Sequence, residues 1–232
     1  MIFMINLTDL NELKIFMEKD LDDSSEDEKL MLLIPIASNW IINWLNRKEF
    51  DYKQRVEYYD GNGTNKICLK AYPAFVDSVR TIQVIIDDNG GYGQIPGSFT
   101  GTPLTYGNDF FLQVDDSDGV TSHAGILIRN NDLWSKQRKR AFGLLTPFLG
   151  KAYGTIQVTY WGGYAPDNIP SEIRFAANNL VSRLNFLLPS GFELSGSTFQ
   201  EQTVSIFAPQ KNYLMSLVTP MIQSYRNLRF SR

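Results

Sequence analysis

The chain has one cysteine and one histidine among its 232 residues. A lone cysteine cannot form an intramolecular disulfide, and Cys68 stands in the strand-like run KICLK, where a small buried thiol is expected. With His123 as the sole imidazole, zinc sites built from histidine and cysteine and Cys-His nucleophilic pairs are almost excluded. We therefore expect no catalytic residue, no metal site and no cofactor, and we interpret the protein as not being an enzyme.

Nucleotide-binding signatures are also incomplete. The tripeptide GKA at 150–152 is similar to the end of a P-loop, but no glycine lies five residues before Gly150, and Ala152 replaces the serine or threonine that binds magnesium. Residues 115–119, DDSDG, have carboxylates at alternate positions, but they lack the distal glutamate of a calcium-binding loop and favour a solvated turn. A hydrolase that uses two sequence-distant acids remains an alternative, although nothing singles out a pair.

Targeting and membrane signals are weak. The first ten residues lack the basic region and the cleavage site of a signal peptide. The uncharged run Leu30–Asn46 is short for a membrane span and contains Pro35 and several asparagines. A helix that is apolar on most faces, with an asparagine stripe, is better explained as buried in a bundle or between subunits. We expect no membrane contact and assembly in a reducing cytoplasm.

Charge is unevenly distributed along the chain. Residues 1–30 contain nine acidic and three basic side chains, a net charge of −6, whereas residues 202–232 contain four basic side chains and no acidic one. Such ends are able to complement each other in a head-to-tail subunit contact, although solvated ends are the simpler interpretation. The strongest local cluster, KQRKR at 136–140, is a candidate for contacts with phosphates or acidic neighbours, with the solvated loop again the alternative. The candidates are Lys136, Arg138, Lys139 and Arg140.

The order of predicted elements is helices, then strands, then helices. Thr8 and Asp9 begin a short helix; Ser24 or Ser25 caps a longer one in which Pro35 marks either a kink or the true start. Between about 55 and 160 the sequence alternates as in antiparallel strands, and residues 56–73 predict a hairpin across GNGT. The clearest helix follows Pro170. A last helix, interrupted by Pro220, has as its apolar residues Tyr213, Leu214, Leu217, Val218, Met221 and Tyr225.

This order predicts an α+β fold in which N- and C-terminal helices form a small bundle around a large antiparallel β insertion. The expected divisions are 1–50 for the first helices, 51–165 for the β region and 166–232 for the last helices and a basic tail. At the end of the β region, VTYWGGYAP (158–166) is expected to be a structural corner. In this interpretation the glycines permit the chain to reverse and the aromatic rings pack in the core; the alternative is that the rings form a binding platform. The residues concerned are Trp161, Gly162, Gly163 and Tyr164.

Four stretches carry a resemblance when they are taken in order. They are INLTDLNELKIFMEKDLDDSSEDEKLMLLIPIASNWIINWL, then EYYDGNGTNKICLKAYP, then GTIQVTYWGGYAPDNIPSEIRFAANNLVSRL, and last TVSIFAPQKNYLMSLVTPMIQSYRN. The series resembles the head-to-tail connector proteins of tailed bacteriophages, also called adaptor or head-completion proteins. No single motif is specific, but the order covers most of the chain. The large β region and Pro35 depart from the shorter members of that family.

The resemblance implies a structural virion protein in the neck, at the head-tail interface, assembled in the host cytoplasm. It implies a ring, twelvefold like the portal, that docks beneath the portal, extends the channel for packaged DNA and presents a surface to the stopper or tail proteins. Carried onto this chain, the candidate portal contacts are Tyr225, Arg226, Arg229 and Arg232. The alternative function is a virion-surface or carbohydrate-binding β module that uses Trp161 and Tyr164.

Overall fold

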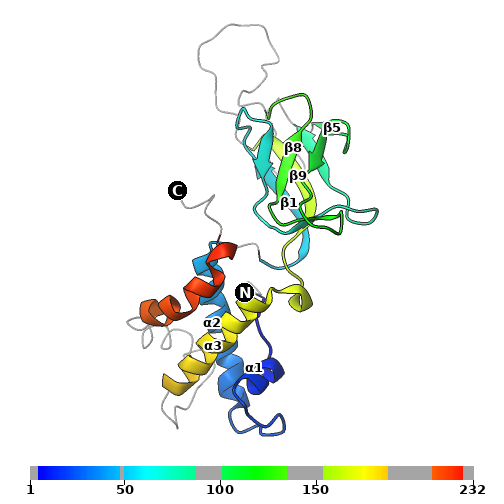
Figure 1. Cartoon of the computed structure of the whole chain (residues 1–232). Coiled ribbons are helices and arrows are strands. Elements are labelled where there is room, and N and C mark those ends of the chain that lie inside the picture. The colour runs from blue at the N-terminus through cyan, green and yellow to red at the C-terminus, as the bar shows by residue number, and fades with distance from the viewer. Residues whose placement is uncertain (1–4, 48–49, 87–100, 135–153, 188–210, 227–232) are drawn as a thin grey trace. The chain divides into compact units, whose positions relative to one another are not determined.

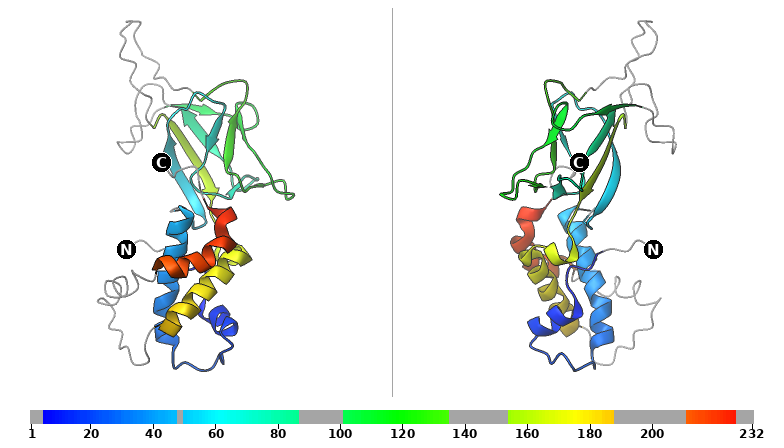
Figure 2. Two further views of the ribbon diagram at one scale, coloured as in Figure 1. Left: turned by 60° about the vertical axis from the view of Figure 1, so that its left-hand side comes forward. Right: turned by 90° about the vertical axis from the view of Figure 1, so that its right-hand side faces the viewer.

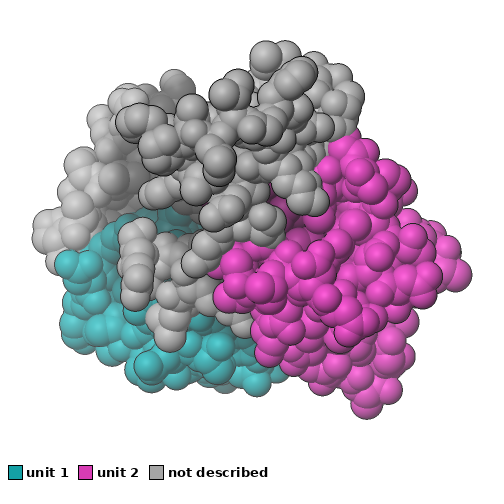
Figure 3. Space-filling model, turned by 90° about the horizontal axis from the view of Figure 1, so that it is seen from above, with its two compact units in different colours: residues 1–50, 165–232 teal, residues 51–164 magenta. Residues whose placement is uncertain are grey.

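The computed structural model describes residues 5–47, 50–86, 101–134, 154–187 and 211–226 (Figure 1). The chain divides into two compact units, coloured separately in Figure 3. Residues 1–50 and 165–232 form what we call the helical unit, and residues 51–164 form the β unit. The predicted α+β class with antiparallel sheets is confirmed, since every pair of named strands in the described part of the chain is antiparallel.

The helical unit contains α1 (Leu10–Phe16), α2 (Asp27–Leu45) and α3 (Ser171–Leu187), with the helix over residues 211–222, here called the C-terminal helix. Short 3₁₀ turns cover Pro166–Asn168 and Gln223–Tyr225. Asp9 caps α1 by accepting a hydrogen bond from the Glu12 amide at 2.8 Å.

One expectation about α2 is corrected, and one of the two alternatives for Pro35 is excluded. No serine caps it: Glu26 stands at the N-cap without a side-chain hydrogen bond, while the Ser25 amide donates to Asp23. Pro35 does not mark its start, because the helix runs through that position. At its other end, Asn46 adopts the left-handed conformation (φ 54°), which asparagine tolerates better than most residues.

Residues far apart in sequence pack together in the helical unit. Helix α2 packs against α3, and α1 contacts both (Figure 2). The preceding segment is held by buried hydrogen bonds: the Leu7 amide donates to Ser38 Oγ at 3.0 Å, and Thr8 Oγ1 donates to Asn178 Oδ1 at 2.6 Å. Asn178 is buried, so leaving its amide unpaired would cost about 1–3 kcal/mol.

The C-terminal helix also differs from expectation. It continues through Pro220 as far as residue 222. Its buried residues are Leu214, Met215, Val218 and Ile222, which follow helical spacing. Tyr213 and Met221, expected on the apolar face, are instead 65% and 41% exposed.

The strands in the described part of the β unit form a six-stranded and a three-stranded sheet. The larger has the order β5-β4-β9-β3-β7, with β1 also paired to β9; the smaller has the order β2-β8-β6. The strands are β1 (Lys53–Tyr59), β2 (Lys66–Cys68), β3 (Ala74–Phe75), β4 (Gln83–Ile86), β5 (Thr102–Leu104), β6 (Phe110–Leu112), β7 (Thr121–Ser122), β8 (Ile126–Arg129) and β9 (Ile156–Gly162). Strand β9 therefore organises the unit, pairing with three others.

The predicted hairpin over residues 56–73 is wrong. Strand β1 pairs with β9, and β2 pairs with β8 of the other sheet. The turn between them is bonded elsewhere: the Gly63 amide donates to the Trp134 carbonyl at 2.7 Å, and the Trp134 amide donates to the Thr64 carbonyl at 2.8 Å. The glycines and asparagine of GNGT indicate a turn, but which strands pair is decided by packing between residues distant in sequence.

Large side chains fill the core of the β unit. Trp134, Phe110 and Tyr160 are fully buried, together with aliphatic residues of both sheets. The Trp134 indole donates to the Asn65 carbonyl at 3.1 Å, so its polar atom is satisfied. Cys68 is half-buried rather than buried as expected.

Candidate interaction surfaces

The end of the described chain is held within the helical unit. The Tyr225 hydroxyl donates to Glu172 Oε2 at 3.0 Å, and this hydrogen bond contributes to a lowered pKa of Glu172, after its own backbone amide. The Arg226 guanidinium lies 4.9 Å from the centroid of the Trp44 ring. These two predicted portal contacts therefore fasten the C-terminal helix to α2 and α3.

The other charged candidates are not placed by the structure. Arg229 and Arg232 lie outside the described residues, as do Lys136, Arg138, Lys139 and Arg140. Their assignment to the portal, to a neighbouring subunit or to the DNA channel stays a prediction.

The corner VTYWGGYAP ends β9, and its geometry needs glycine twice. A Cβ at Gly162 would lie 2.8 Å from Tyr160 Cε2 and 2.9 Å from the Ala71 carbonyl oxygen. Gly163 has a φ of 101°, and its amide donates to the Pro73 carbonyl at 2.9 Å. Tyr164 is buried. The corner thus has packing and backbone roles within the β unit.

Trp161 instead contributes to an open face of the larger sheet. Its ring lies 5.3 Å from that of Tyr52, which stands edge-on to Phe75 at 5.5 Å. The same face continues with exposed or half-buried uncharged side chains: Gln54, Val56, Tyr58, Gln83, Ile85, Gln157 and Thr159. At its border, Arg80 lies 4.8 Å from the centroid of Phe75 and pairs with Asp77. This is an aromatic and amide surface almost free of charge.

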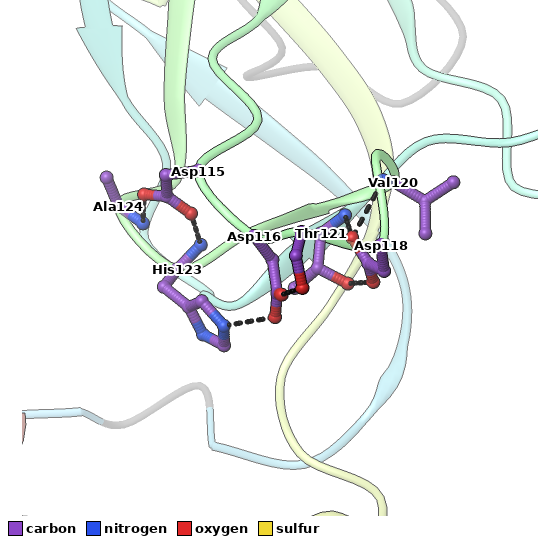
Figure 4. A network of polar contacts seen from close by, with 8 residues as sticks. Asp115, Asp116, Asp118, Val120, Thr121, His123 and Ala124 are labelled. Atoms are coloured by element: carbon purple, nitrogen blue, oxygen red, sulfur yellow. Dashed lines mark hydrogen bonds and ion pairs between the residues drawn. The ribbon is translucent and has the colours of Figure 1, made fainter.

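The acidic turn at 115–119 is satisfied by its own loop (Figure 4). Asp115 accepts from the amides of His123 and Ala124 at 2.6 and 2.9 Å, and Asp118 accepts from those of Val120 and Thr121 at 2.8 Å. His123 Nε2 lies 2.8 Å from Asp116 Oδ2, and this contact lowers the pKa of Asp116.

The carboxylates of this turn point to local amides, which explains their spacing without an ion. No group of three potential metal ligands gathers among the residues that the structure describes.

A buried carboxylate escaped sequence reasoning. Glu57 is 9% exposed and accepts hydrogen bonds from the hydroxyls of Tyr59 and, at 2.9 Å, Tyr160. Those hydroxyls in turn accept from the amides of Lys70 (3.0 Å) and Ala71 (2.9 Å). Burial raises the pKa of both tyrosines, which keeps them protonated as donors. Side chains alternate along β1, so Glu57 and Tyr59 lie on the same face of the strand. This alternation was the sequence signal from which their contact could have been predicted.

A cavity of about 550 Å³ lies within the helical unit. Its walls come from residues 5–9, from the first turn of α1, from α2, from the turn at 166–169 and from Arg174 of α3. Arg174 crosses this wall, donating to the Pro166 carbonyl at 2.6 Å and to Glu12 at 3.3 Å. Glu12 and Arg174 thus form an ion pair in the wall of this cavity.

Comparisons with known proteins add no relative. No protein-family model matches the chain, and no curated protein matches it. No helix within the described ranges is long and apolar enough to cross a membrane.

Proposed function

We propose that the protein is a structural virion component, a head-to-tail connector that forms a ring beneath the phage portal. In this role it extends the DNA channel and provides the attachment surface for stopper or tail proteins. It acts without catalysis or cofactor, and its partners are the portal, the neighbouring copies and the next neck protein. It resides in the virion neck after assembly in the host cytoplasm.

One observation supports this proposal most. The helical segments that carry the resemblance to connectors, from both ends of the chain, meet in one unit, while residues 51–164 form a separate contiguous unit. We take the helical unit to be the small bundle expected of a connector and the β unit to be its insertion. The packing of α2 on α3, with α1 against both, is compatible with such a bundle.

The portal contact is proposed for the basic tail. Tyr225 and Arg226 anchor its start on Glu172 and Trp44. Arg229 and Arg232 then follow as the charges available for the portal, and we assign Lys136, Arg138, Lys139 and Arg140 to the DNA channel or a subunit contact. Phosphate contacts of this kind weaken as salt concentration rises.

Electron microscopy of the purified protein mixed with the portal of the same phage tests the function. We expect a closed ring on one face of the portal. A variant lacking residues 227–232 should keep its helical circular dichroism, because Arg226 and Trp44 remain, but should no longer co-sediment with the portal. Undiminished co-sedimentation would refute the tail assignment, and a protein that never associates with the portal would refute the function.

A second candidate is a carbohydrate-binding β module on the virion surface. The open face around Tyr52, Phe75 and Trp161 favours it, since aromatic rings with amides are suited to neutral sugars. Glycan-array binding that is lost in Trp161→Ala and kept in Val79→Ala, an exposed control, would favour this module. Binding that is absent from the wild type would remove it.

A further inference from the structure

The cavity of the helical unit combines an apolar interior with an acidic rim. Leu7, Ile34 and Ile169 line it, and each is buried. Met31, which also lines it, is 52% exposed, so the cavity opens to solvent beside an apolar side chain. A concave site of this kind is suited to an apolar side chain of a ligand.

The charges on the rim favour a basic ligand. The lining residues include three carboxylates and one guanidinium, a net charge of −2; they are Asp9, Glu12, Asp167 and Arg174. Glu12 is paired with Arg174 at 3.3 Å, whereas Asp9 and Asp167 occupy exposed positions. A segment that presents an arginine next to an apolar side chain therefore complements both parts of the cavity.

Residues 227–232, NLRFSR, have this chemistry and lie outside the described part of the chain. Leu228 and Phe230 flank Arg229, and Arg232 follows. No acidic residue occurs after Glu201, so the whole segment is suited to an acidic rim.

The structure places the start of this segment close to the cavity. Tyr225 donates to Glu172 in the first turn of α3, and Arg226 lies over Trp44. The turn that begins α3 at Pro166–Asn168 contributes to the cavity wall. Six extended residues reach about 20 Å, whereas a helix with its side chains is about 10–12 Å wide. The segment is therefore long enough to pass the start of α3 and enter the cavity of its own chain.

We propose that residues 227–232 bind in this cavity of their own chain before the protein meets the portal. Phe230 enters the apolar interior, and Arg229 pairs with the carboxylates of the rim. The free protein thus holds its basic tail on its own helical unit, and the portal has to displace it from there. This competition with the portal rests on the proposed function, whereas the docking itself does not.

The lone cysteine makes a direct test practical. In a Cys68→Ser background, Ser231→Cys is combined with Asn6→Cys at the cavity or, as a control, with Phe186→Cys, which is 89% exposed near the other end of α3. Disulfide formation is followed by intact mass in the absence of portal, and each rate is normalised to the reaction of the single-cysteine variants with oxidised glutathione. The Asn6→Cys pair should close about tenfold faster than the control pair, because docking raises the effective concentration of the two thiols. Equal rates in the two pairs, or disulfides that join two chains, would overturn the docking.

Substitutions in the Asn6→Cys pair test the chemistry of the site. Asp167→Asn should slow disulfide formation about threefold, the scale of an exposed ion pair. Glu28→Gln, an exposed acid of α2 that does not line the cavity, is the matched control and should leave the rate unchanged. Phe230→Ser should slow the reaction further, because it removes the apolar side chain that enters the cavity. A rate that neither Asp167→Asn nor Phe230→Ser lowers would refute the proposed contacts.

Portal binding separates this inference from the proposed function. Once its disulfide has formed, the Asn6→Cys pair should bind the portal about tenfold more weakly in co-sedimentation than after reduction, since the tail is no longer available. Portal binding that the disulfide leaves unchanged would refute the competition. A wild-type chain that never co-sediments with the portal, together with fast closure of the Asn6→Cys pair, would refute the connector proposal and support the docking.

Discussion

The polar contacts inside the two units differ in which parts of the chain they join. In the β unit Asp118 bonds to its own turn at Val120 and Thr121, and a longer contact such as that of Glu57 with Tyr160 also lies within residues 51–164. In the helical unit Thr8 bonds to Asn178, 170 positions away, so that the contact joins the two ends of the chain. A unit made from one contiguous segment is suited to variation as an insertion, whereas the helical unit requires both ends of the chain. This difference is consistent with our proposal that assembly involves the helical unit.

The largest effect that separates the units is expected from Trp134→Ala. Removing this fully buried ring should cost about 3–5 kcal/mol of β-unit stability. Hydrogen exchange measured by mass spectrometry should accelerate in β-unit peptides and stay unchanged in α2 and α3. Leu133→Ala, at a site 56% exposed, is the control and should have little effect. Equal acceleration in both units would show that they unfold as one.

A smaller loss is expected from Gly162→Val at the corner. The added side chain would meet Tyr160 and the Ala71 carbonyl at under 3 Å, so we expect a loss of about 1–3 kcal/mol in urea unfolding. Gly119→Asn is the control, because a Cβ there has no neighbour within 4 Å and asparagine tolerates its φ of 71°. A corner that accepts valine without loss of stability would contradict its packing role.

In the helical unit, Thr8→Val should lower the free energy of unfolding by about 1–2 kcal/mol. It deletes the donor to buried Asn178 while keeping the shape of the side chain. Hydrogen exchange should rise in α1 and the first turns of α3 but not in the β unit. Thr102→Val, at an exposed position of β5, is the control. Faster hydrogen exchange confined to the β unit would contradict the stabilising role of the Thr8–Asn178 hydrogen bond in the helical unit.

The smallest effect is electrostatic and lies in the β unit. Hydrogen bonds from Arg80 and nearby amides lower the pKa of Asp77 from 3.8 to about 2. Because the pKa of Asp77 is lower in the folded protein than in the unfolded chain, its carboxylate stabilises the fold at every pH above the unfolded-state pKa. This contribution is lost as the pH falls toward 2. Arg80→Gln should raise the pKa toward 3.8 in a carboxyl NMR titration, whereas Arg183→Gln in α3 should not move it. An unchanged value in Arg80→Gln would exclude the pairing as the cause.

Elements with strong local periodicity were predictable from the sequence. The helix after Pro170 and the strand that ends at the double glycine occur as α3 and β9, and the α+β class is confirmed. Partners between strands were not predictable, because the Gly63 turn is bonded to Trp134 rather than closing a hairpin. The exposure of Tyr213 and Met221 was not predicted, because periodicity alone does not decide which apolar side chains of a helix reach the core.

The candidate residues divide in the same way. The corner glycines were identified by their backbone freedom, but Trp161 pairs with Tyr52, which no local pattern links to it. Tyr225 and Arg226 were singled out by charge and position, while their partners Glu172 and Trp44 depend on how three helices meet. Buried Glu57 was overlooked because a lone acid in a strand is ordinarily solvated.

Native mass spectrometry of the full chain, alone and with the portal of the same phage, tests the central claim most directly. The connector proposal predicts a complex in which the copies of this chain equal the subunits of the portal ring, whatever the state of the free protein. A chain that stays monomeric in the presence of portal and gives no joint complex would contradict it.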